Sequence, residues 1–168
     1  MMVYLAFGSN LTSKFGNSIF TITKAYAELE KCGVQILKKS SFYRSKAFPD
    51  PKDPEFINSV VQARANITPN NLIKIIFKIE KKFGRLRLNK NDPRTLDIDI
   101  IDFNSRKIKI KNRIASLQIP HSSLEKRLFV LMPLIELKSS WKNPESGRLI
   151  VQLLSKISRL GDNKITKL

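Results

Sequence analysis

The order of strand-like and helix-like segments limits the fold of this sequence more than any other feature. Apolar residues at three- and four-residue spacing predict two helices, over about residues 15–31 and 69–83. Segments with strand-like alternation or apolar runs lie at four places: residues 3–7, 34–44, 56–63 and 95–103. The resulting order, strand, helix, strand, strand, helix, strand, is that of a split β-α-β unit. It predicts an α+β fold of the ferredoxin-like type, in which an antiparallel sheet packs with helices in three layers.

Turn and capping residues mark the ends of these segments. Gly33 and Gly84 stand where left-handed residues commonly end helices, and Thr68 followed by Pro69 is a typical helix start. Three prolines within residues 45–54 predict a loop, because proline lacks a backbone donor. In the rest of the chain, the pattern predicts a strand pair at residues 108–110 and 113–118, a short helix at 123–131 and a final amphipathic helix at 147–160.

The length of 168 residues suits a single domain, which we expect to span residues 1–168. Cys32 is the only cysteine of the sequence, so no disulfide can form within the chain, and a reducing cytoplasm is the expected compartment. The apolar runs are short and interrupted, and no basic segment precedes the apolar start. We therefore expect a cytoplasmic monomer without a membrane partner.

The strongly basic charge has two interpretations. The sequence has 31 Lys and Arg against 14 Asp and Glu, a formal net charge of +17. Such an excess attracts polyanions, which favours nucleic acid or a phosphorylated small molecule as the partner. Lys, Asn and Ile are all abundant, however, as expected of an AT-biased coding sequence, and the surplus lysines are then only a charged surface.

Two aspartates on the last predicted strand of the core are candidate metal ligands. Asp97 and Asp99 lie two residues apart and therefore project from one face, whereas Leu96, Ile98 and Ile100 take the other. Two carboxylates side by side repel each other unless a cation sits between them. Mg²⁺ is typically held by one or two carboxylates, water and substrate phosphates. A solvated outer face of an amphipathic strand would produce the same alternation.

Arginines near these aspartates favour a phosphate ligand. Arg85, Arg87 and Arg94 lie on a polar segment just before the strand, and guanidinium groups match phosphate oxygens geometrically. Glu80 lies near the C-terminal end of a predicted helix, where its charge is unfavourable, so it either pairs with an arginine or binds a ligand. The residues alone thus favour a metal-dependent enzyme that acts on a nucleotide phosphate.

A second group of candidates lies nearer the end of the chain. His121 follows Pro120, and Arg127 comes six residues later, which suits phosphate binding, although a solvated histidine is the simpler interpretation. Phe56 and Phe129 are either core residues or the walls of a site for a flat heterocycle.

Seven segments, in order, resemble the 6-hydroxymethyl-7,8-dihydropterin pyrophosphokinase family. They are AFGSNL (6–11), SFYR (41–44), FIN (56–58), GRLR (84–87), PRTLDIDI (93–100), PH (120–121) and RLF (127–129). The resemblance implies transfer of a pyrophosphoryl group from ATP to the hydroxymethyl group of a reduced pterin, a step of folate biosynthesis that releases AMP. ATP and the reduced pterin are then the expected partners, and no specific nucleic acid is expected.

The resemblance also implies roles for individual residues. Asp97 and Asp99 would hold two Mg²⁺ ions, and Arg85 and Arg94 would neutralise phosphate charge during catalysis. Residues that match nucleotide-binding positions are Glu80, Arg87, Ile98, Gln118, His121 and Arg127, with Ile98 and Gln118 acting through nearby backbone groups. Residues that match pterin-binding positions are Ser45, Phe48, Phe56, Asn58 and Phe129, with the ring held between the two phenylalanines and its polar edge read by Asn58.

Three departures from the family pattern accompany the resemblance. Asn91 and Asp92 precede Pro93 where relatives often carry a tryptophan, Ser122 stands where tyrosine is common, and Phe77 replaces a polar residue. We expect weaker nucleotide binding or loop closure, with activity retained. A different class of function, a basic ferredoxin-like RNA-binding module, stays as the alternative, although the Lys/Arg-Gly-Phe type motif of such modules is absent.

Overall fold

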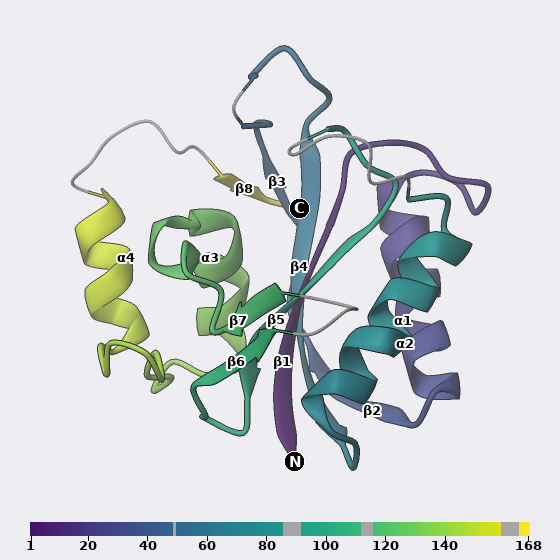
Figure 1. The fold of residues 1–168 in the computed structure, drawn as a ribbon. Helices are drawn as coiled ribbons and strands as arrows, with labels where there is room; N and C mark the ends of the chain where they lie inside the picture. Colours follow the sequence, from purple (N-terminus) through teal and green to yellow (C-terminus); the bar gives the residue numbers. More distant parts are fainter. Residues whose placement is uncertain (49, 86–91, 112–115, 159–164) are drawn as a thin grey trace.

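The computed structural model of the chain describes residues 1–48, 50–85, 92–111, 116–158 and 165–168. In these residues an antiparallel sheet of six strands forms the middle of the molecule (Figure 1). The strands are β1 (Met2–Ser9), β2 (Val34–Lys39), β3 (Tyr43–Ser45), β4 (Phe56–Ala65), β5 (Asp97–Phe103) and β8 (Ile165–Lys167). They lie in the order β5-β1-β4-β3-β8, and β2 pairs with the other end of β4.

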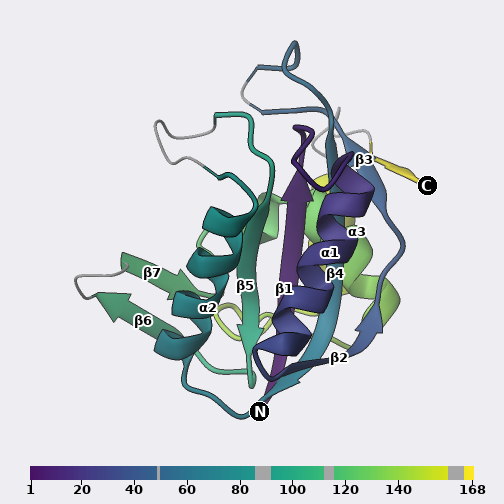
Figure 2. The same cartoon turned by 90° about the vertical axis from the view of Figure 1, so that its right-hand side faces the viewer.

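Helices cover both faces of this sheet. Figure 2 shows α1 (Ser18–Lys31) and α2 (Pro69–Lys82) in front of one face. On the opposite face lie α3 (Leu128–Leu137) and α4 (Ile150–Ser158) (Figure 1). The three-layer, ferredoxin-like α+β prediction is therefore confirmed, since α1 and α2 follow the first and third predicted strands on one side of the sheet.

Side-chain alternation on β1 divides the interior into two cores. Val3, Leu5 and Phe7 pack with α1 and α2, whereas Tyr4 and Ala6 pack with α3 and α4. Successive strand residues point to opposite faces, so a strand between two helical layers is apolar on both sides. The site described below lies on the α3 face, where this apolar pattern gives way to polar side chains.

The predicted helix ends are mostly confirmed. Asn17 caps α1 through a hydrogen bond from the Phe20 backbone, so the helix begins later than predicted. Thr68 caps α2 with Pro69 in its first turn, as expected. Gly33 and Gly84 follow the two helices with φ of 82° and 85°, a backbone conformation that favours glycine.

The single strand predicted over residues 34–44 is wrong, because the chain divides there into β2 and β3. Ser40 lies between them and bonds twice to Val60. Its N–H donates to the Val60 carbonyl at 2.9 Å, and its Oγ accepts from the Val60 N–H at 2.9 Å. The serine side chain thus takes the place of a backbone carbonyl, which interrupts the regular ladder.

The single helix predicted over residues 123–131 is also wrong. A 3₁₀ turn, η1 (Leu124–Lys126), is followed by Arg127 in a non-helical conformation, and α3 then continues to Leu137. Pro133 lies inside α3 and removes one helical hydrogen bond. The buried side chains of Val130 and Leu134 hold this apolar helix against the sheet.

The remaining predictions hold in part. The predicted strand pair is present as β6 (Ile108–Lys111) and β7 (Ser116–Ile119), although residues 113–115 lie outside the described ranges. The final helix is α4, which is shorter than predicted, and β8 was not predicted at all. No helix in the described ranges is both long and apolar enough to cross a membrane.

The ion pairs of Glu28, between α1 and α2, yield a pH prediction. Hydrogen bonds from Lys82 at 2.5 Å and Lys31 at 2.9 Å lower the pKa of Glu28 to about 2. A lowered carboxyl pKa stabilises the fold above the ordinary value of 4.5, and this contribution disappears as the pH falls through about 2. As the pH falls across this range, the free energy of unfolding measured in urea should decrease less in Glu28→Gln than in wild type. An equal decrease in both proteins would contradict a lowered Glu28 pKa as the cause.

Candidate active site

A row of paired residues crosses the sheet on the α3 side. Asp97 of β5 lies opposite Gly8 of β1, Gly8 opposite Asn58 of β4, and Asn58 opposite Tyr43 of β3. Directly paired residues of antiparallel strands share a face. The row therefore places a carboxylate and a carboxamide on the same face with a glycine between them, and Asp99 joins them two residues along β5, as predicted.

Gly8 keeps the space between these polar groups open. A Cβ atom at this position would lie 3.9 Å from the Asp97 Cβ and 3.6 Å from both Asn58 Oδ1 and Phe56 Cδ1. These are ordinary contacts, so a methyl group would fit, but any larger side chain would fill the space between the two polar groups. Because Gly8 has no side chain, its backbone forms the floor of the candidate site.

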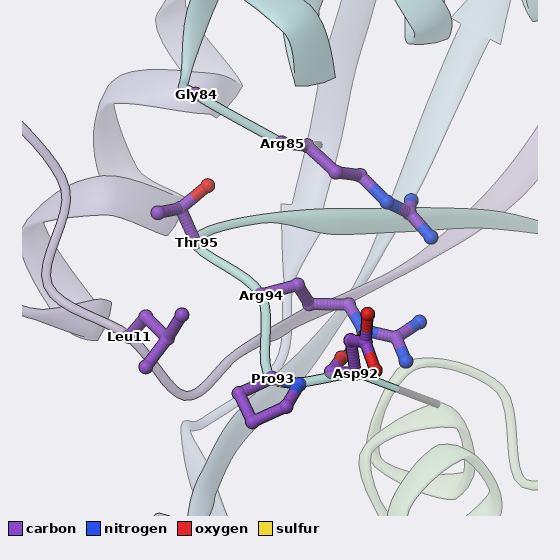
Figure 3. Close-up of a pocket in the computed structure, with 7 residues that line it drawn as sticks. All are labelled: Leu11, Gly84, Arg85, Asp92, Pro93, Arg94 and Thr95. Atoms are coloured by element: carbon purple, nitrogen blue, oxygen red, sulfur yellow. Dashed lines mark hydrogen bonds between the residues drawn. The ribbon is translucent and has the colours of Figure 1, made fainter. Parts of the chain in front are cut away.

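Asp97 is held by two arginines. Arg94 Nη1 donates to it at 2.9 Å, and Arg85 Nη1 at 2.5 Å. Figure 3 shows both arginine side chains directed to the same side of a hollow of about 200 Å³. The hollow is lined by Leu11, Gly84, Arg85, Asp92, Pro93, Arg94 and Thr95. Two guanidinium groups of the predicted set thus converge on the predicted metal ligand.

Glu80 takes the first of its two predicted roles, as an arginine partner. Its side chain is only 2% exposed and pairs with Arg85. It also accepts a hydrogen bond of 2.9 Å from the Ile98 backbone N–H. Attraction to Asp97 and Glu80 outweighs burial and raises the pKa of Arg85. Glu80 therefore holds Arg85 in place and also accepts from the Ile98 N–H, so that among the backbone groups near Ile98, where adenine binding is predicted, this donor already has a partner.

Asp99 lies beside Arg127 and His121. Arg127 Nη1 donates to Asp99 at 2.7 Å, and Arg127 Nη2 lies 3.3 Å from His121 Nε2. Burial, followed by repulsion from Asp97, raises the pKa of Asp99 above its usual range. Burial, followed by the Arg127 charge, lowers the pKa of His121. Arg127 opposes the repulsion between the two carboxylates, and a cation bound between them would do the same.

The carboxylates fit a magnesium ion only together with ligands from outside the chain. Among the residues that the structure describes, no group of three or more His, Cys, Asp or Glu side chains lies close enough to hold a metal. Asp97 and Asp99 supply oxygen ligands on one face. Mg²⁺ accepts such a pair when water and substrate phosphates complete its coordination.

Two of the pterin-binding candidates, Asn58 and Ser45, lie toward the β3 end of the row. Asn58 is 3% exposed, and its Nδ2 donates to Ser45 Oγ at 2.9 Å. Phe56 and Phe129 are half-buried, with the Arg94 and Arg127 guanidinium groups 6.0 Å and 5.8 Å from the respective ring centres. Phe48 differs, because its side chain is 84% exposed. Both rings therefore face the arginine-lined side rather than the core alone.

The other predicted nucleotide-binding residues are less closely gathered. Gln118 of β7 and His121 line a separate hollow of about 260 Å³ beside η1. Ser122 lines this hollow and is exposed, so this position presents only a short side chain. Arg87 lies outside the described residues, as does Asn91.

Asn10 is a site residue that the sequence reasoning missed. Its Oδ1 accepts from the Arg94 N–H at 2.7 Å, and its Nδ2 donates to the Pro54 carbonyl at 3.0 Å. Its own N–H donates back to the Arg94 carbonyl at 3.1 Å. Asn10 thus joins the segment of Arg94 to the loop before Phe56. The signals were a buried strand that ends in Gly-Ser-Asn, which also describes an ordinary turn, and the place of Asn10 in the AFGSNL segment of the family resemblance, which gave it no role.

Comparison with known proteins identifies relatives. The family described as 7,8-dihydro-6-hydroxymethylpterin-pyrophosphokinase (HPPK) matches residues 4–139. A 2-amino-4-hydroxy-6-hydroxymethyldihydropteridine pyrophosphokinase from Synechocystis is 39% identical over 148 residues, which cover 88% of this chain and 73% of that protein. The protein of the same name from Haemophilus influenzae is 32% identical, with 98% and 96% covered. The folic acid synthesis protein fol1 of Pneumocystis carinii is 36% identical, but only 20% of its length is spanned.

Solved structures support the fold. The wild-type HPPK-DHPS of Plasmodium falciparum superposes with a TM-score of 0.72 at 16% identity. The match covers 95% of this chain and 45% of that one, so the chain spans less than half of the solved protein. The likeness therefore concerns the arrangement of strands and helices.

Proposed function

The chain belongs to the 7,8-dihydro-6-hydroxymethylpterin-pyrophosphokinase family, and we propose on that basis that the α3 face of its sheet transfers pyrophosphate from ATP to 6-hydroxymethyl-7,8-dihydropterin. The products are AMP and the pterin diphosphate, in a step of folate biosynthesis. The RNA-binding alternative has no support from the three relatives reported above, each of which is named for pterin or folate synthesis.

One observation carries the proposal: Asp97, Gly8 and Asn58 lie side by side across three strands. A phosphoryl transfer requires the nucleophile and the phosphate to be held next to each other. Asp97 stands at the phosphate end with its arginines, and Asn58 stands at the pterin end. Gly8 leaves the intervening space open for the hydroxymethyl group and the phosphorus that it attacks.

At the phosphate end, Asp97 and Asp99 would hold Mg²⁺, and we expect two ions. Bound there with ATP, the metal would supply charge neutralisation and phosphate alignment. Arg85, Arg94 and Arg127 now pair with the two carboxylates. Once the carboxylates bind metal, these guanidinium groups can donate to phosphate oxygens, where they stabilise the charge that develops during transfer.

The remaining nucleotide contacts involve several elements. His121 and Arg87 match phosphate-binding positions, and backbone groups near Ile98 and Gln118 match the adenine site. The buried position of Glu80 supports an indirect role, through Arg85 and the Ile98 N–H, rather than direct contact with ATP. Ser122 offers no ring to the nucleotide, which supports weaker ATP binding than in relatives with tyrosine.

At the pterin end, the Phe56 and Phe129 rings would enclose the flat heterocycle. Asn58 Nδ2 is occupied by Ser45, so its Oδ1, on the side of Gly8, is the atom that would accept from the pterin. Backbone groups near Ser45 and Phe48 would complete this side. We expect the chain to act as a monomer, and the single Cys32 suits the reducing cytoplasm.

The direct test is to incubate the protein with ATP, Mg²⁺ and 6-hydroxymethyl-7,8-dihydropterin and to identify the nucleotide product by chromatography. AMP should form in equal amount with the pterin diphosphate, and neither should form without the pterin. ADP as the main product would show transfer of a single phosphoryl group and would overturn the proposal.

Enlarging Gly8 should separate pterin binding from folding. A Gly8→Leu side chain would extend from the floor between Asp97 and Asn58, and we expect the pterin KM to rise by at least about tenfold, the cost of displacing a well-fitted ligand group. Gly8→Ala is the matched control, because its methyl group fits and should change the pterin KM much less. Steady-state kinetics and thermal unfolding of both variants provide the measurement. Equal pterin KM values for the two variants would contradict the geometry.

A further inference from the structure

Glu136 of α3 gathers three hydrogen-bond donors from one edge of the sheet. Its carboxylate accepts from the Ser41 N–H at 2.8 Å, from the Tyr43 hydroxyl at 2.6 Å and from Lys167 Nζ at 2.6 Å. The donors belong to the connection before β3, to β3 itself and to β8. One helix side chain therefore fastens three separate segments of the chain.

These hydrogen bonds hold β3, a strand too short to be stable without such contacts. β3 has only three residues, whereas strands in globular proteins commonly have five or six. It lies between β4 and β8, and Tyr43 is paired with Lys167 on its outer side. The Leu168 N–H also donates to the Phe42 carbonyl at 2.9 Å. Glu136 thus joins two neighbouring residues of this edge, Tyr43 of β3 and Lys167 of β8, to α3.

β3 in turn determines how Asn58 is oriented. The Asn58 Nδ2 donates to Ser45 Oγ of β3 at 2.9 Å, its shortest hydrogen bond, and lies 3.4 Å from the Phe56 carbonyl of its own strand and 3.5 Å from the Tyr43 carbonyl of β3. Because Asn58 is buried, the orientation of its carboxamide is determined by these hydrogen-bond partners. With Nδ2 directed to β3, the Oδ1 atom lies on the side of Gly8. A shift of β3 would therefore turn the acceptor away from the site.

We propose that Glu136 is a positioning residue for pterin recognition, which acts through β3 on the orientation of the Asn58 carboxamide. This inference rests on the proposed function, because it assigns Asn58 to the pterin side of the site. The contacts of Glu136 are with Ser41, Tyr43 and Lys167, so it would act on the pterin only through β3. Its effect should be confined to the pterin half, because Arg85, Arg94 and the aspartates are held by β5, α2 and Asn10, and Arg127 stands at the opposite end of α3 from Glu136.

The charge of Glu136 is maintained throughout the working pH range. Burial opposes ionisation, but hydrogen bonds from Lys167, Tyr43 and Ser41 outweigh it and lower the pKa of Glu136 to about 2. A neutral glutamine has nearly the same shape, yet it presents one acceptor oxygen and one NH₂ donor instead of two acceptor oxygens. Glu136→Gln therefore removes part of the network without leaving a cavity.

The test compares the KM values of the two substrates in Glu136→Gln. We expect the pterin KM to rise about tenfold, as for loss of a charge-assisted hydrogen bond, while the ATP KM and kcat stay within about twofold of wild type. Lys167→Met removes one donor only and should raise the pterin KM about threefold, as for an exposed ion pair. A pterin KM unchanged in both variants would overturn the inference, and so would equal increases in the KM values of both substrates.

Glu28→Gln is the matched control. Glu28 is also a helix carboxylate with lysine donors, and its side chain is 19% exposed against 22% for Glu136. It joins α1 to α2 on the opposite face of the sheet and should leave the pterin KM unchanged. An increase equal to that of Glu136→Gln would show a general effect of lost ion pairs and would overturn the inference.

A spectroscopic readout separates this inference from the proposed function. In ligand-free protein, the Asn58 side-chain amide resonance should shift in Glu136→Gln, and the amides of β3 should exchange faster with solvent. Both should stay as in wild type in Glu28→Gln. If wild type makes no AMP but these changes occur, the proposed function fails while the link from Glu136 to Asn58 stands. If the Asn58 resonance does not move, the link itself fails.

Discussion

Asp97→Asn and Asp99→Asn are each expected to lower kcat by at least about a thousandfold, because metal-assisted neutralisation of the phosphates depends on both carboxylates. Asparagine has the same shape but lacks the negative charge that holds the ion. The fold should persist, since the two side chains are 26% and 34% exposed and neither lies in an apolar core. AMP formation at saturating substrates and magnesium titration by calorimetry provide the measurements.

The control for these variants is again Glu28→Gln, which removes a carboxylate with two cationic partners far from the site. It should leave kcat and magnesium affinity unchanged. If Asp99→Asn kept wild-type activity and magnesium affinity while folding normally, the proposed metal site would be wrong.

The two arginines that hold Asp97 should behave differently when replaced. Arg94→Met should lower kcat about a hundredfold, as expected for loss of one group that stabilises transition-state charge. Its effect on the free energy of unfolding should be below about 1 kcal/mol, because Asp97 keeps Arg85 and the pair is partly exposed. Single-turnover kinetics and urea unfolding measure the two effects separately.

Arg85→Met should lose both activity and stability. Arg85 is 11% exposed and pairs with Glu80, which is 2% exposed, so the replacement removes the cation from a buried carboxylate. The loss should be about 3 kcal/mol in the free energy of unfolding, the usual result when one partner of a buried pair is removed. The double variant Arg85→Met/Glu80→Gln should recover much of the stability but none of the activity. Equal stability of the two single arginine variants would contradict the buried role of Glu80.

Local spacing explains why much of the fold and part of the site could be predicted. A period of two residues places Asp97 and Asp99 on one face and Ile98 on the other, whatever the strand pairs with. Caps such as Thr68 with Pro69 act within one turn of the chain, so their outcome does not depend on distant residues. The predictions that failed concern interruptions, such as Ser40, whose partner Val60 lies twenty residues away.

Interactions between residues far apart in the chain could not be predicted from the sequence. Nothing in the spacing of Glu80 shows whether it meets an arginine or a ligand, because that depends on how α2 packs beside β5. Asn10 and Glu136 likewise appear ordinary in sequence, one as a turn residue and the other as a polar residue of an apolar helix. Their roles arise from contacts across 84 and 95 residues of chain, to Arg94 and Ser41.

The sequence by itself determined the order of the main strands and helices of the core, the faces of the aspartate-bearing strand, and the carboxylates and arginines available for chemistry. These follow from backbone geometry that repeats every two or 3.6 residues. Only the tertiary structure decided which arginine meets which carboxylate, and that Gly8 opens the space between Asp97 and Asn58. Those outcomes depend on strand register and helix packing, which many distant residues set together.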